Sequence, residues 1–72
     1  MSTNDRVECR SDFEYAQRPV AFYWQGERLM VTEILAQSLH PEGYAFQVRN
    51  EERGIFELDY DNSTDQWSVR QL

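Results

Sequence analysis

The chain has 72 residues and a formal net charge of −6, and aromatic residues make up 14% of it. This length allows one domain with a small core, in which each buried aromatic ring removes about 150–250 Å² from water. The excess of acidic groups opposes non-specific binding to nucleic acid and to anionic membranes, because both depend on basic side chains.

The first eighteen residues are polar and predict neither a signal peptide nor a membrane anchor. No segment is long and apolar enough to span a bilayer, so we expect no membrane association. Cys9 is the only cysteine, which excludes an internal disulfide and indicates a reduced, cytoplasmic setting. We expect residues 1–18 to form a flexible N-terminal tail, with a short edge strand around Phe13 and Tyr15 as the alternative.

Apolar residues on both sides of Gln25 and Gly26 predict a β-hairpin as the first ordered element. Pro19 marks its start, because proline is tolerated at the first residue of a strand. A two-residue turn sets a register that separates two faces. The face expected in the core comprises Val20, Phe22, Trp24, Leu29 and Val31. The other face comprises Ala21, Tyr23, Arg28, Met30 and Thr32.

The second strand of this hairpin is predicted to begin at residue 27 and to reach residue 36 or 39. Its apolar spacing changes from two to three between Val31 and Ile34, which indicates a bulge near Thr32 and Glu33. Such a bulge would bend the strand and let one ribbon serve two sides of a small barrel. A helix over residues 31–39 is the alternative, because the same apolar residues also fit helical spacing.

Three further strands are predicted over residues 44–49, 55–60 and 67–71. A turn at residues 40–43 and polar loops at 50–54 and 61–66 connect them. The apolar alternation gives one consistent register, in which residue 48 opposes 56, 46 opposes 58, 44 opposes 60, and 69 opposes 58. The expected core is Val20, Phe22, Trp24, Leu29, Val31, Ile34, Phe46, Val48, Phe56, Leu58, Tyr60, Trp67 and Val69.

Five short strands joined by local turns predict an all-β fold. We expect a single five-stranded antiparallel meander, curled into a small SH3-like barrel over residues 19–72.

The turn glycines and aromatic residues also form a pattern of their own. It comprises Pro19, Phe22, Trp24, Gly26, Val31, Ile34-Leu35, Phe46-x-Val48-Arg49, Gly54, Phe56-Glu57-Leu58, Tyr60-Asp61 and Trp67. Over residues 19–71 this pattern resembles a small bacterial all-β domain of unknown function, found as short stand-alone proteins. A similar module stands at the C-termini of some Y-family translesion polymerase-like proteins. The resemblance implies a bacterial, cytoplasmic setting and a link to DNA repair, and it transfers no catalytic residues.

No group of residues in the sequence predicts catalysis. His40 precedes a proline in a turn, without an obvious partner to orient its imidazole. Cys9 lies in the expected tail, where no neighbour lowers the pKa of its thiol. We therefore expect a protein that is not an enzyme and that uses no cofactor.

One acidic run has the spacing of a calcium loop. Asp59, Asp61, Ser63 and Asp65 alternate with other residues, as the oxygen ligands of such loops do. The run lacks the glycine and the final glutamate of that loop, and it follows a strand rather than a helix. We interpret it as a polar turn and expect no metal.

The candidate binding surface is the non-core face of the first hairpin. Tyr23 and Arg28 are cross-strand neighbours there, and Met30 shares the face. These three residue types are enriched at the centres of protein interfaces. Arg49 and Ile55 are expected nearby, on the third and fourth strands. The leading hypothesis is a module that binds an unidentified protein through this face or through a free strand edge.

A nucleic-acid-associated accessory domain linked to DNA repair is the alternative. In that case Arg28, Arg49 and Arg70 would form a basic groove beside the aromatic ring of Tyr23. The net charge disfavours this function, and a small enzyme is a third and weaker hypothesis. We expect a monomer or, if strand edges stay uncovered, a weak homodimer.

Overall fold

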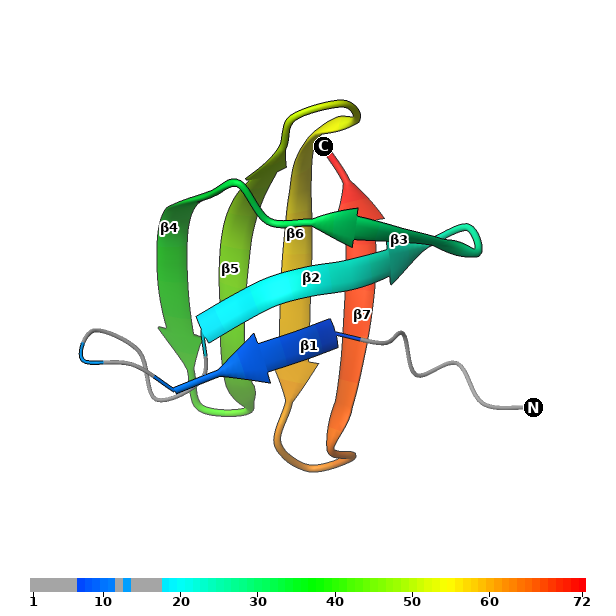
Figure 1. Ribbon diagram of the computed structural model, residues 1–72. Coiled ribbons are helices and arrows are strands. Elements are labelled where there is room, and N and C mark those ends of the chain that lie inside the picture. Colours follow the sequence, from blue (N-terminus) through cyan, green and yellow to red (C-terminus); the bar gives the residue numbers. More distant parts are fainter. Residues whose placement is uncertain (1–6, 12, 14–17) are drawn as a thin grey trace.

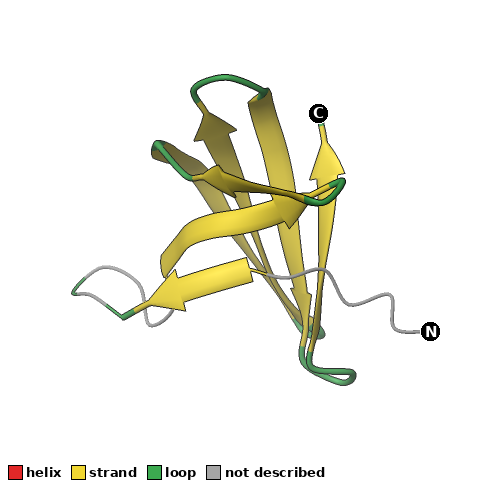
Figure 2. Cartoon of the chain, turned by 45° about the vertical axis from the view of Figure 1, so that its right-hand side comes forward, coloured by secondary structure: helices red, strands yellow, loops and turns green. Residues whose placement is uncertain are grey.

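The computed structural model describes residues 7–11, 13 and 18–72. These residues form seven strands and no helix (Figures 1 and 2). The strands are β1 (Val7–Arg10), β2 (Arg18–Trp24), β3 (Glu27–Met30), β4 (Glu33–His40), β5 (Gly43–Asn50), β6 (Gly54–Asp61) and β7 (Gln66–Gln71). They form two antiparallel sheets, ordered β1-β2-β3 and β4-β5-β6-β7. Figure 1 shows the first sheet lying across the strands of the second.

The all-β, antiparallel prediction is confirmed, but the prediction of one five-stranded meander is wrong. The described residues form seven strands in two separate sheets, and these do not close into a barrel. One additional strand, β1, lies within the stretch predicted as a tail. The other arises because the predicted second strand is divided into β3 and β4.

β1 pairs antiparallel with β2, with Val7 opposite Phe22, and its register shifts after Glu8. The side chain of Val7 packs against the core. The alternation of Val7 and Cys9 is too short to identify this strand from sequence. The alternative strand around Phe13 and Tyr15 is not supported at Phe13, which lies in an exposed bend. Tyr15, with the rest of residues 14–17 and residues 1–6 and 12, lies outside the described residues.

The register of the first hairpin is confirmed. Trp24 pairs with Glu27, and Phe22 pairs with Leu29. The two turn residues between these strands, Gln25 and Gly26, have φ angles of 50° and 80°. Positive φ at both positions is typical of the tight turn whose twist matches that of its flanking strands.

The chain crosses from the first sheet to the second at Val31 and Thr32. The Val31 N–H donates to the carbonyl oxygen of Val20 at 3.0 Å, and the Thr32 N–H donates to that of Arg49 at 2.9 Å. The two consecutive residues are therefore bonded to different sheets. The sequence predicted a bulge here, but the structure has a break between strands.

β4 follows this crossing, so the alternative of a helix over residues 31–39 is wrong. Its pairing with β5 shifts by one residue between Ile34 and Ala36, which places the bulge beyond the predicted position. The apolar spacing of three between Val31 and Ile34 falls at the break between β3 and β4, before this shift.

The registers predicted for β5, β6 and β7 are confirmed. Val48 pairs with Phe56, and Leu58 pairs with both Phe46 and Val69. Gly43 begins β5 at a close approach of two backbones, since a Cβ atom there would lie 1.9 Å from the carbonyl oxygen of Tyr60. This contact, rather than the turn that the sequence indicates, requires glycine at position 43.

The core lies between the two sheets, and most of its members were predicted. Its buried residues are Phe22, Leu29, Phe46, Val48, Phe56, Leu58 and Val69. Trp24, Val31, Ile34 and Trp67 pack against them and are partly buried. The ring of Phe56 joins the sheets, with its centroid 4.9 Å from that of Phe22 and 5.4 Å from that of Trp24. Val20 and Tyr60 are only half-buried, and the unpredicted Ala21 and Ala45 are buried.

Candidate functional site

The structure brings together three of the five predicted site residues. Tyr23 pairs with Arg28 across β2 and β3, and the Arg28 Nη1 lies 3.3 Å from the sulfur of Met30. Arg49 and Ile55 pair with each other in the second sheet, where they alternate with buried core residues. They therefore face outward on the opposite side of the molecule, away from the other three.

Arg28 spans the first sheet. Its Nε and Nη2 donate to the two carboxylate oxygens of Glu8 at 2.9 and 2.8 Å, so the ion pair reaches from β3 across β2 to β1. This bidentate contact raises the pKa of Arg28, mainly through the hydrogen bond. Ala21 lies on the crossed strand between Glu8 and Met30 and is fully buried. Arg28 therefore holds the sheet together as well as lining its surface.

A hollow of about 450 Å³ opens between β3 and the turn that joins β5 to β6. We call it the β3 hollow. Its lining consists of Glu27, Arg28, Leu29, Met30, Thr32, Asn50, Glu51 and Glu52. Leu29 is buried, whereas Met30 is 49% exposed. The predicted residues Arg28 and Met30 thus belong to a hollow that the sequence did not indicate.

Asn50 holds the wall of the β3 hollow in place. Its Oδ1 accepts hydrogen bonds from the backbone N–H groups of Glu52 at 3.0 Å and Arg53 at 2.8 Å. Its Nδ2 donates to the carbonyl oxygen of Met30 at 2.8 Å. The side chain is buried, and all of these bonds are internal to the protein. Asn50 therefore fixes the shape of the turn and fastens it to β3.

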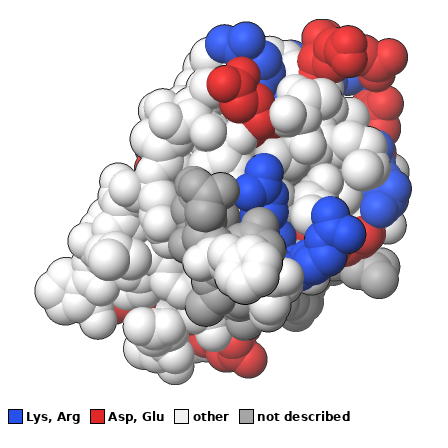
Figure 3. Space-filling view, turned by 60° about the vertical axis from the view of Figure 1, so that its left-hand side comes forward, with Lys and Arg blue, Asp and Glu red and all other residues white. Residues whose placement is uncertain are grey.

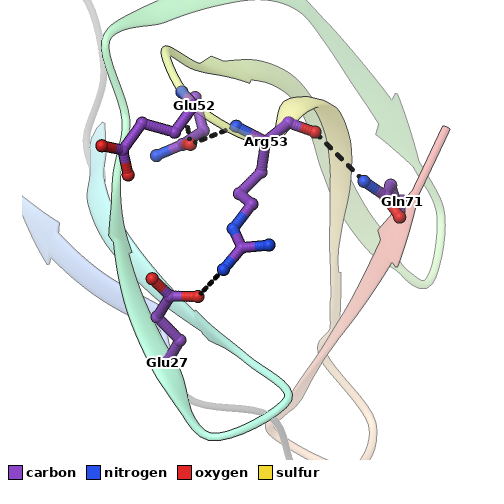
Figure 4. A network of polar contacts seen from close by, with 5 residues as sticks. Glu27, Glu52, Arg53 and Gln71 are labelled. Carbon is purple, nitrogen blue, oxygen red and sulfur yellow. Dashed lines mark hydrogen bonds and ion pairs between the residues drawn. The ribbon is translucent and has the colours of Figure 1, made fainter.

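Arg53 makes a second connection between this turn and its surroundings (Figure 4). Its Nη2 donates to the Glu27 carboxylate at 2.5 Å, and its carbonyl oxygen accepts from the Gln71 Nε2 at 3.1 Å. Gly54 ends the turn with a φ of 98°. The turn is thus joined to β3 and to β7, which gives the β3 hollow a rigid wall.

The charges around the β3 hollow are predominantly negative. Among the described residues, four arginines pair with glutamates, as Arg28–Glu8, Arg49–Glu33, Arg53–Glu27 and Arg70–Glu57. No described cation pairs with Glu51 or Glu52, which lie at the rim. Figure 3 shows acidic side chains, with basic ones beside them, at the upper end of the molecule, and Figure 1 places the β5–β6 turn at that end. The rim therefore carries uncompensated negative charge.

A second cluster, of three half-buried aromatic rings, lies at the other end of the second sheet. The ring centroids of Tyr44, Tyr60 and Trp67 are 5.1–5.8 Å apart. The Tyr60 hydroxyl donates to the carboxylate of Asp65, and this bond raises the pKa of Tyr60 to about 12. The rings pack on one another and extend the core.

Cys9 lies beside this cluster. It lines a hollow of about 210 Å³ together with Val7, Arg10, Ser11 and Trp67. Partial burial raises the pKa of the Cys9 thiol, which lowers its reactivity.

The acidic run begins within β6 and ends in the turn that follows this strand. Asp61 Oδ1 accepts hydrogen bonds from the Ser63 N–H at 2.9 Å and the Ser63 hydroxyl at 2.7 Å. These bonds lower the pKa of Asp61. Within the described part of the chain, no three side chains of the histidine, cysteine or acidic types are placed to hold a metal ion.

No family model, curated protein or solved structure matches this chain. The resemblance to the small bacterial domain therefore remains a prediction. The residues that the structure describes include no helix that could cross a membrane.

Sequence reasoning missed Asn50, Glu51 and Glu52 of the β3 hollow. An asparagine at the start of a turn often accepts hydrogen bonds from N–H groups two and three residues later. The sequence therefore does indicate the local role of Asn50 in this turn. Its bond to Met30 joins residues 20 apart in the chain. No local pattern indicates that bond, and it is the bond that places the acidic turn beside β3.

Proposed function

We propose that this protein is a non-enzymatic protein-interaction module and that the β3 hollow receives a basic segment of its partner. The observation that carries the proposal is the chemistry of the lining. Met30, which is exposed, supplies apolar surface beside the buried Leu29, and Glu51 and Glu52 supply carboxylates. A lysine or arginine side chain needs both, because its aliphatic stem packs on apolar groups while its charged end binds carboxylates.

Two further properties support a basic partner. The net charge of −6 steers positively charged segments toward the protein and raises their association rate. The hydrogen bonds of Asn50 fix the wall before binding, which reduces the entropy lost on association. Tyr23 extends the surface on the outer face of the same sheet.

The nucleic-acid alternative has less support. Arg28 lies in the first sheet, whereas Arg49 and Arg70 lie in the second, and each pairs with a glutamate. A groove for nucleic acid needs a continuous row of available basic groups. These three arginines do not provide such a row, so we place protein recognition first.

The experiment begins with affinity capture from cells of the source organism, followed by calorimetry on the purified partner. We expect Glu51→Gln combined with Glu52→Gln to weaken binding about tenfold or more, and added salt to weaken binding to the unaltered protein. The matched control is Glu42→Gln combined with Glu33→Gln, which changes the net charge equally at positions outside the hollow and removes only the 3.7 Å contact between Glu33 and Arg49.

Two results would contradict the proposal. Equal losses in the two double variants would show that overall charge, and not the β3 hollow, determines binding. Failure to capture any protein that binds the purified chain would contradict the interaction function itself. Met30→Ala supplies a further test, since it removes apolar lining without changing charge.

A further inference from the structure

The two sheets have four edge strands, and one of them differs from the others in charge. β1 carries Glu8 and Arg10, β3 carries Glu27 and Arg28, and β7 carries Arg70. β4 carries Glu33 at its first position, but its residues 34–39 (ILAQSL) contain no charged residue, although 28% of the whole chain is charged. Charged side chains on an edge strand are a common protection against pairing with another chain. β4 lacks that protection over six consecutive residues.

The edge of β4 is also accessible. Residues 36–40 are all exposed, and Leu39 is 79% exposed. Among the described strands, β4 pairs with β5 alone, and it forms the outer border of its sheet in Figure 1. Figure 3 brings this side of the molecule forward and shows a largely uncharged surface at its left.

The backbone groups at this edge can be assigned from the pairing. The Arg49 carbonyl accepts from Thr32, so the odd-numbered residues of β5 direct their hydrogen bonds toward β4. Their partners Ala36, Ser38 and His40 direct theirs back toward β5. In an antiparallel ladder the intervening residues point the other way. Gln37 and Leu39 therefore present their N–H and C=O groups at the free edge.

We infer that a second copy of this chain pairs with β4 in an antiparallel arrangement. With a two-fold axis beside Ser38, Gln37 of one copy lies opposite Leu39 of the other, and both pairs can exchange backbone hydrogen bonds. The two four-stranded sheets then form one continuous sheet. The same residues supply donors and acceptors on both copies, so this edge is complementary to itself.

Charge distinguishes this edge from the others as the place where a second copy meets the least repulsion. Each copy carries a net charge of −6, so association through most of the surface brings like charges together. The uncharged β4 segment avoids that repulsion at the contact. A single pair of strands buries less than the roughly 1,200 Å² of a stable interface, so we expect a weak dimer. Salt screens the remaining repulsion and should strengthen it, which is the opposite of its expected effect on a basic partner.

Sedimentation velocity over a concentration series, at low and high salt, tests this inference. We expect a dimer whose population rises with protein concentration and with salt. Ser38→Lys places two like charges opposite each other at the two-fold axis and should raise the dissociation constant at least about tenfold. Ser68→Lys is the matched control, because it makes the same change at an exposed position of the opposite edge strand and should not weaken the dimer.

Circular dichroism checks that both variants keep the fold. A monomer at all concentrations up to about 1 mM overturns the inference, as does equal dimerisation of the Ser38→Lys and Ser68→Lys variants. In the dimer, the amide protons of Gln37 and Leu39 should become protected from exchange at high concentration, and unchanged exchange there also counts against it. Because Ser38 does not line the β3 hollow, failure of this inference leaves the proposed function untouched.

Discussion

The two sheets are stabilised by different means. The second sheet contributes five of the seven buried core residues, and its four strands are six to eight residues long. The first sheet contributes only Phe22 and Leu29, and both of its edge strands have four residues. It depends in addition on polar connections, namely the Arg28–Glu8 pair across it and the bond from Asn50.

This difference indicates a division of roles. Apolar burial and regular pairing make the second sheet the stable part of the molecule. The first sheet presents polar side chains and lines the β3 hollow. It is held in place partly by individual polar interactions, each of which can be removed by one substitution. We therefore expect amide protons of β5 and β6 to exchange more slowly than those of β1 and β3. Substitutions in each sheet test this difference in stability.

Gly43→Ala should have the largest effect, because it damages the stable sheet. The added Cβ would lie 1.9 Å from the Tyr60 carbonyl oxygen, which is backbone and cannot move aside independently. We expect a loss of about 3 kcal/mol or more in the free energy of unfolding, measured by urea denaturation. Gly26→Ala is the comparison, because its Cβ would meet nothing within 4 Å and only the strain of its φ of 80° should destabilise the fold, by about 1–2 kcal/mol. A similar loss in both variants would contradict the close-approach argument.

Asn50→Ala should detach the β5–β6 turn from the first sheet. It leaves the Met30 carbonyl and the N–H groups of Glu52 and Arg53 without their partner. We expect a loss of about 2–3 kcal/mol, with faster amide exchange in β3 than in β5. Asn62→Ala, at an exposed turn position, should cost much less. Equal effects of the two substitutions would show that Asn50 is not a structural connection.

Gln25→Asn should stabilise the first sheet. Gln25 has a φ of 50°, in the left-handed region where asparagine is better tolerated than glutamine. We expect a gain of about 0.5 kcal/mol in the free energy of unfolding. The same substitution at Gln66, in a strand, should give no gain. A loss at position 25 would contradict the turn geometry.

Glu8→Gln tests the ion pair across the first sheet. The pair is solvent-exposed, so we expect only a small decrease in the denaturation midpoint, which high salt should diminish. Glu33→Gln should have a still smaller effect, because Glu33 makes a single contact with Arg49 at 3.7 Å. An effect of Glu33→Gln as large as that of Glu8→Gln would contradict the special role of the bidentate pair.

Ser63→Ala should have the smallest effect on stability. It removes the hydrogen bond from the Ser63 hydroxyl to Asp61, which is local to one turn of the second sheet. The folded-state pKa of Asp61 is lowered by its bonds to Ser63, so their stabilisation is present above the unfolded-state pKa and is lost as the pH falls through the lowered value. We expect the variant to bring the pKa of Asp61 closer to its usual value, as measured by carboxyl NMR titration. Asp59, whose pKa is raised mainly by burial, is the internal control and should not change.

The parts of the fold that sequence predicted are those determined locally. Three hairpin registers follow from apolar alternation across short turns, as in the pairing of Phe22 with Leu29 or Val48 with Phe56. β1 could not be predicted, because it is short and its pairing depends on residues beyond an intervening polar stretch. The separation of β3 from β4 depends on bonds to two different sheets, which no periodicity reveals.

The candidate site was predicted only in part, for the same reason. Arg28 and Met30 were identified because their residue types and shared face are visible in the sequence. Glu51 and Glu52 read as members of a polar loop, and only the long-range bond between Asn50 and Met30 brings them to the first sheet. Arg49 and Ile55 were assigned to the same surface as Arg28 and Met30 because a single curled sheet was expected. In the structure they lie on the second sheet and face the opposite side of the molecule.

The crossing at Val31 and Thr32 also affects whether copies of this chain can exchange their first sheets by domain swapping. Domain swapping requires a connecting segment that can straighten and let one part of a molecule dock onto another. Here the two connecting residues are bonded to Val20 and to Arg49, so straightening would break a hydrogen bond on each side. The first sheet is therefore retained by its own chain, and we expect refolding at high concentration to return each molecule to its own pair of sheets.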